Sequence, residues 1–117
     1  MKRRTILAAA LAGGLTFTGF TTAALAVDDL RIIAPAATGG GWDQTARAMA
    51  EAMTAGGATG VTVENVPGAG GTVGLAQLVD QEKGKPNVLM VNGLVMVGAI
   101  LTNQSPVNLG MVTPVAR

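Results

Sequence analysis

The chain contains neither cysteine nor histidine among its 117 residues. Without cysteine there are no disulfide bonds or thiol nucleophiles, and without histidine there are no imidazole bases and fewer of the usual zinc ligands. Charged residues make up only 13% of the chain, and a formal net charge of +1 provides no basic surface for nucleic acid. The 49% hydrophobic content argues against disorder. We therefore expect a folded protein, not an enzyme, with no metal, no cofactor and no nucleic-acid partner.

The first 26 residues have the pattern of a secretory signal peptide. Residues 2–4 are basic, residues 6–20 are apolar, and residues 24–26 supply small side chains before a cleavage site expected ahead of Val27. A retained membrane anchor is the alternative, but the run is rich in Ala, Gly and Thr and lacks a stop-transfer flank. We expect a cleaved signal and a periplasmic protein, exported by the general secretory route, although Arg3-Arg4 also resembles a twin-arginine signal.

The mature chain is weakly acidic. Removing 26 of 117 residues leaves 91, with five basic and seven acidic side chains. Trp42 is the only aromatic residue that remains. No basic patch for a polyanion survives cleavage, so any anion must be bound by something other than a cluster of cations.

Hydrophobic periodicity predicts alternating strands and helices in residues 27–117. Trp42, Ala46, Met49 and Met53 recur at helical spacing, whereas the β-branched run 61–65 alternates as a strand does. The predicted strands are 30–33, 61–65 and 88–91, with a fourth beginning in 111–115. The predicted helices are 42–54, 72–80 and 95–102, and 82–86 is a polar turn in which Lys83 and Lys85 are solvated. This order predicts an α/β fold with a doubly wound parallel sheet. Three short strands make a thin sheet with open edges, so we expect the first part of a larger lobe.

Glycine-rich loops follow the first two predicted strands. In a parallel sheet both loops lie at the carboxyl edge, where ligands bind, and each leads into a helix whose first N–H groups are unpaired. Glycine lets an anion approach those groups closely. The predicted ligand-binding residues are Gly40, Gly41, Trp42, Asp43, Pro67, Gly68, Ala69, Gly70, Gly71 and Thr72, with Asn92 as a third wall. The alternative is that the glycines serve only tight turns and helix packing.

The spacing of these glycines favours a carboxylate over a nucleotide. No lysine follows either cluster as a Walker loop requires, and Gly74 falls one residue too late for the dinucleotide fingerprint. Thr72 is predicted to cap its helix, and Asp43 to cap the first loop or accept a hydrogen bond from a ligand hydroxyl or water. Arg47 either pairs with Asp43 or binds the anion. We expect Asn65 to pin the loop.

With these residues, the chain resembles the extracytoplasmic substrate-binding receptors of tripartite tricarboxylate transporters, the Bug-type solute receptors. The resemblance covers residues 27–117 and depends on the segments 34–47, 63–71, 93–99 and 112–117. It implies a two-lobed periplasmic binding protein of which this chain is a truncated first lobe. It also implies a citrate-like ligand, held by backbone amides and ordered waters of the two loops and then delivered to membrane permease subunits. The missing second lobe predicts weak or no carboxylate binding by the isolated chain.

Two other interpretations stay open. An enzyme acting on a phosphorylated or acyl substrate could use the same loops, but only Asp43, Glu64 and scattered threonines are available as reactive groups. The second interpretation is a non-functional fragment that retains the family sequence but does not fold stably. A melting transition of residues 27–117 distinguishes a folded chain from such a fragment.

Overall fold

The computed structural model describes residues 28–116, and the predicted signal peptide, residues 1–26, lies outside them. The elements are β1 (Arg31–Ala34), α1 (Gly41–Ala55), β2 (Thr62–Asn65), the 3-10 turn η1 (Ala69–Gly71), α2 (Thr72–Gln81), β3 (Val88–Met90), α3 (Leu94–Thr102) and the 3-10 turn η2 (Leu109–Met111). The predicted order of three strands and three helices is confirmed, with most boundaries moved by one residue.

The three strands form one parallel sheet in the order β2-β1-β3. Ala34 pairs with Asn65 of β2, and Ile33 pairs with Met90 of β3, so the carboxyl ends of all three strands meet at one edge. The loops that follow β2 and β3 therefore flank the loop that follows the central strand β1. This arrangement confirms the α/β class and places both glycine-rich loops at the same edge of the sheet.

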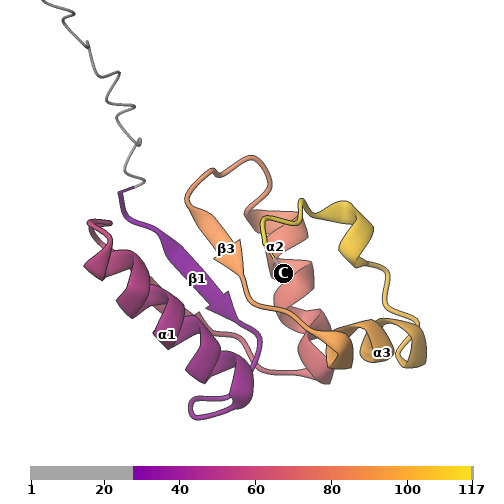
Figure 1. The fold of residues 1–117 in the computed structure, drawn as a ribbon. Coiled ribbons are helices and arrows are strands. Elements are labelled where there is room, and N and C mark those ends of the chain that lie inside the picture. The colour runs from indigo at the N-terminus through magenta and orange to yellow at the C-terminus, as the bar shows by residue number, and fades with distance from the viewer. Residues whose placement is uncertain (1–27, 117) are drawn as a thin grey trace, which may run out of the picture.

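Two hydrophobic clusters hold the helices against the sheet. The first joins Ile32 and Ala34 of β1 to Ala46 of α1. The second joins Leu75 of α2 to Met96 of α3, and it includes Met90, which pairs with Ile33 and therefore points away from the first cluster. Figure 1 shows α1 lying along β1, and α2 beside β3. Successive side chains of a strand project to opposite faces of the sheet, so α1 and α2 pack against side chains from different faces.

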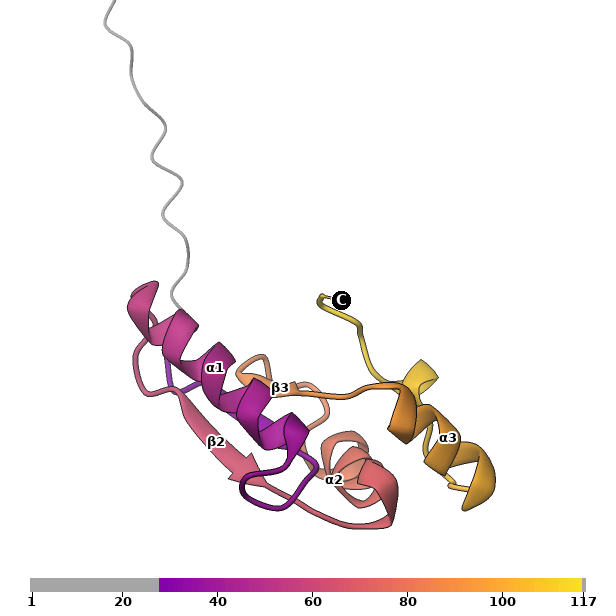
Figure 2. The same cartoon turned by 60° about the horizontal axis from the view of Figure 1, so that its bottom comes forward.

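Helix α3 has little covering. It begins near the start of α1 and runs away from it, as both views show (Figures 1 and 2). Only Met96 of α3 is buried, whereas Leu94 is 85% exposed and Leu101 is 74% exposed. No charged residue occurs between Lys85 and Arg117. A helix that is apolar on every side is normally buried, so this exposed surface is unusual for the outside of a domain.

The predicted fourth strand is wrong. Residues 111–115 form no strand among the described residues: Met111 is the last residue of η2, and the extended chain that begins at Val112 pairs with none of the three described strands. Pro114 also has no N–H to donate to a neighbouring strand. The polar turn 82–86 is confirmed, with Lys83 and Lys85 exposed, and its first residue, Glu82, is buried and binds both Arg31 and Lys85.

No helix within residues 28–116 has the length and apolar character needed to cross a membrane.

Candidate functional site

The loop after β1 leads into α1 without a side-chain cap. Gly40 occupies the N-cap position in an extended conformation, and none of the described side chains bonds to the helix start there. Gly40 instead donates its N–H to the Ala37 carbonyl at 2.9 Å, which closes the turn. Since the first N–H groups of a helix have no partner within it, Gly41 and Trp42 present backbone donors at this edge. The helix begins at Gly41, one residue earlier than predicted.

Asp43 lies in this first turn but is fully occupied by protein donors. Its Oδ2 accepts from the Gly39 N–H at 2.8 Å and from Arg47 Nε at 3.0 Å. Its Oδ1 lies 3.0 Å from Arg47 Nη2 and accepts from Asn65 Nδ2 at 2.8 Å. Arg47, then the Gly39 N–H and Asn65, lower the pKa of Asp43 to about 2 from an ordinary 3.8. The side chain is only 2% exposed, so it braces the loop and has no free oxygen for a ligand.

The Asp43–Arg47 pair and the pinning role of Asn65 are both confirmed. Asn65 Nδ2 also donates to the Ala36 carbonyl at 3.0 Å, which fastens the loop to the end of β2. Arg47 keeps half of its side chain exposed but uses its guanidinium on Asp43 and Asn65. In the described residues Arg47 therefore belongs to the loop brace.

Trp42 fills the space between the loops that follow β2 and β3. It packs against both hydrophobic clusters. A Cβ added at Gly71 would lie 2.9 Å from the indole ring, and one added at Gly93 would lie 3.2 Å from Nε1. Glycine at these two positions lets the indole sit directly against backbone. Trp42 is thus a wall of the carboxyl edge, as predicted, and also part of the core.

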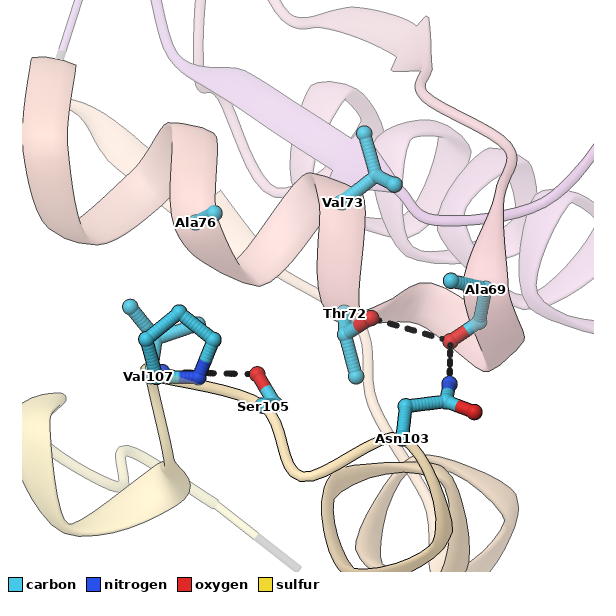
Figure 3. A pocket seen from close by; sticks show the side chains of 8 residues that line it. Ala69, Thr72, Val73, Ala76, Asn103, Ser105 and Val107 are labelled. Atoms are coloured by element: carbon cyan, nitrogen blue, oxygen red, sulfur yellow. Dashed lines mark hydrogen bonds between the residues drawn. The ribbon is translucent and has the colours of Figure 1, made fainter.

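The second glycine loop has an unusual backbone. Four successive residues, Gly68 to Gly71, have positive φ, and Ala69 is among them with φ of 45°. A non-glycine residue in this region is strained and must be held by its surroundings. The Ala69 carbonyl accepts from Thr72 Oγ1 at 3.0 Å and from Asn103 Nδ2 at 3.2 Å (Figure 3).

Thr72 is not the N-cap of α2. That position belongs to Gly71, and Thr72 is the first residue of the helix with its hydroxyl turned back to Ala69. Helix α3 covers this loop, because a Cβ at Gly70 would lie 2.5 Å from the Ala99 Cβ, and one at Gly71 would lie 2.7 Å from the end of Met96. Gly71 and Thr72 are buried. Packing thus accounts for the glycines at 70 and 71, and the start of α2 is less open than the start of α1.

Two hollows lie along these helix starts. The first, about 440 Å³, is at the start of α1 and is lined by Ala36, Gly41, Trp42, Thr45 and Val95. The second, about 400 Å³, lies between α2 and the segment that follows α3 (Figure 3) and is lined by Ala69, Thr72, Val73, Ala76, Asn103, Ser105, Pro106 and Val107. Neither lining contains a charged side chain, so an anion in the mainly apolar α1 hollow could be attracted only by the backbone N–H groups at the helix start.

The first hollow brings together only some of the predicted residues. Gly41 and Trp42 line it, and Gly40 and Asp43 are adjacent in the chain. Ala69 and Thr72 line the second hollow, whereas the remaining predicted residues line neither, namely Pro67, Gly68, Gly70, Gly71 and Asn92.

Sequence reasoning missed three residues of the first hollow. Thr45 stands one helical turn after Gly41, so helical spacing could have found it. Ala36 and Val95 carry no such signal, because tertiary folding alone brings the loop after β1 to the start of α3. Within residues 28–116 no group of acidic side chains could hold a metal ion.

Comparison with protein-family models, with curated proteins and with solved structures finds no match.

Proposed function

We propose that this chain is part of the first lobe of a periplasmic solute receptor and that the start of α1 holds a carboxylate group of its ligand. The observation that carries the proposal is the hollow of about 440 Å³ at the uncapped start of α1, lined by Gly41, Trp42 and Thr45. The lining is mainly apolar and uncharged, and the backbone donors at the helix start suit a small organic anion better than a metal or a reactive substrate.

The two glycine loops have unequal parts in this proposal. The start of α1 is open, since a Cβ at Gly41 would meet nothing within 4 Å. The start of α2 is closed by Trp42 and α3, so only the exposed residues 67–70 of that loop remain to contact a ligand. We therefore propose one principal anion site in place of the two equal sites expected from the glycine pattern.

The doubly wound lobe is part of the same proposal. Its support is the apolar α3, together with a β3 strand that is hydrophobic throughout yet lies at an edge of the sheet. Strands of this composition are usually buried on both faces. Further strands and helices of the lobe would cover both surfaces. The resemblance to Bug-type receptors adds a citrate-like ligand and delivery to membrane permease subunits.

Citrate titration of the mature chain tests the site. Trp42 is its only tryptophan, so its fluorescence and the backbone amide shifts of residues 40–43 report on the same hollow. We expect weak, saturable changes at millimolar citrate that sodium chloride of equal ionic strength does not reproduce. Submicromolar citrate binding would contradict an incomplete lobe, and absence of these changes at tens of millimolar citrate would contradict a carboxylate site formed by the α1 hollow alone.

A substitution of Gly41 sharpens the test. Proline is tolerated at the first position of a helix and removes one N–H, and the extended Gly40 before it suits a following proline. One hydrogen bond to a charged group contributes about 1.5–3 kcal/mol, so Gly41→Pro should weaken citrate binding roughly 10- to 100-fold. Gly41→Ala keeps the N–H and fits the open space, and it should bind nearly as the parent does. Equal binding by Gly41→Pro and the parent would rule out this amide as a donor.

A further inference from the structure

Asn65 occupies a particular place between the two loops. It is the last residue of β2 and pairs with Ala34, the last residue of β1, so its side chain stands where both strands end. The backbone N–H of the next residue, Val66, donates to the Ala34 carbonyl at 2.9 Å. Whatever fixes the Asn65 side chain therefore fixes the loop after β1 relative to the end of β2.

The Asn65 amide uses all of its hydrogen-bonding capacity on one loop and one helix. Nδ2 donates to the Ala36 carbonyl at 3.0 Å and to Asp43 Oδ1 at 2.8 Å. Oδ1 accepts from Thr38 Oγ1 and from Arg47 Nη2, each at 3.4 Å. A carboxylate at this position would lose both donors, and an alkyl side chain would lose all four bonds, so the geometry specifically requires an amide.

The bond to Asp43 passes this constraint to the helix start. Asp43 holds the Gly39 N–H, and Arg47 balances its charge from the next turn of α1. The carboxylate that would otherwise repel an anion at the start of α1 is thereby turned toward the protein and neutralised. The loop is fixed at Ala36, Thr38 and Gly39 through this one network of side chains.

We propose that Asn65 is a positioning residue for the anion site: it fixes Asp43 so that this carboxylate braces Gly39 and the backbone donors at Gly41 and Trp42 remain directed at the ligand. The inference rests on the proposed function, because it assigns the network a purpose at the same site. It places Asn65 and Asp43 outside direct contact with the ligand.

The experiment measures the amide hydrogen exchange of Gly39 and the citrate affinity in the mature chain. Asn65→Ala should speed Gly39 exchange and weaken citrate binding, each by about tenfold, because the brace on Asp43 is lost. Asn87→Ala removes a different asparagine, whose Nδ2 donates to the Asp29 carbonyl at 3.1 Å, and should leave both quantities unchanged. Val79→Ala, in the second hydrophobic cluster, should lower thermal stability without changing citrate affinity.

A double substitution guards against simple unfolding. Asn65→Asp alone places two carboxylates together and should disrupt the loop. Combined with Asp43→Asn, it restores the bond between positions 43 and 65 with the donor reversed but not the bond to the Ala36 carbonyl, so Gly39 protection and citrate affinity should recover only in part. Unchanged Gly39 exchange in Asn65→Ala, or no recovery in the double variant, would overturn the positioning role. If the parent chain binds no citrate, the α1 hollow alone is not a carboxylate site, and the Gly39 measurements still decide whether Asn65 braces the loop.

Discussion

Gly70→Ala is the most direct test of how α3 closes the second glycine loop. Gly70 has φ of 63°, and a Cβ at this position would lie 2.5 Å from the Cβ of Ala99. Gly84 is a matched control because its φ is 82° and a Cβ there would meet nothing within 4 Å. Both variants place alanine in the left-handed region, but only Gly70→Ala also forces α3 away from the loop.

The two variants separate backbone strain from steric contact. The left-handed conformation costs alanine about 1–2 kcal/mol, so both variants should lose about this much free energy of unfolding. Overpacking adds typically 1–3 kcal/mol at Gly70, so its Tm should fall roughly 10 °C below that of Gly84→Ala in a domain of this size. Thermal unfolding followed by circular dichroism measures this difference. When Ala99→Gly is added to Gly70→Ala, the contact between the two Cβ atoms is lost, and the extra decrease in Tm relative to Gly84→Ala should disappear. Equal Tm values for the two single variants would refute the packing of α3 on this loop.

Three further results are expected. Lys85 first, and then Arg31, lower the pKa of Glu82. The stability that the Glu82 carboxylate contributes is therefore present above its ordinary pKa of 4.5 and is lost as the pH falls below that value. Glu82→Gln should flatten the dependence of Tm on pH below 4.5. Arg47→Met should raise the Asp43 pKa from about 2 toward 3.8, as carboxyl carbon shifts in an NMR titration would show. Leu75→Ala should lower the free energy of unfolding, measured in urea, by about 2–5 kcal/mol. Leu94 is exposed, so Leu94→Ala should change the free energy of unfolding by less than about 0.5 kcal/mol.

The order of elements was predictable because local signals agree along the chain. Apolar residues at helical spacing from Trp42 to Met53 and the β-branched residues at 61–63 each favour one structure. A parallel sheet follows from strand–helix alternation, and that sheet then places the loops at one edge. The brace at Asp43 was also predictable, since an acidic residue in the first turn and an arginine four residues later are neighbours on a helix.

The openness of each helix start was not predictable from these signals. Gly40 and Gly41 resemble Gly70 and Gly71 in the sequence, yet the first pair begins an uncovered helix and the second pair lies beneath Trp42 and α3. The covering side chains come from positions distant in sequence, so no local spacing reports them. The predicted fourth strand did not form for a related reason. A segment with β-like sequence becomes a strand only where a neighbouring strand can pair with it.

The same amino acid therefore has two different uses at one edge of the sheet. Glycine at 71 is needed because a side chain would displace the Trp42 ring, whereas glycine at 41 has open space where a Cβ would stand. The Gly71 N–H already donates to the Gly68 carbonyl at 2.8 Å, whereas the Gly41 N–H belongs to the uncapped start of α1 beside a hollow. Trp42 thus closes the neighbouring helix start and at the same time forms a wall of the hollow at α1, which is the arrangement that the proposed anion site requires.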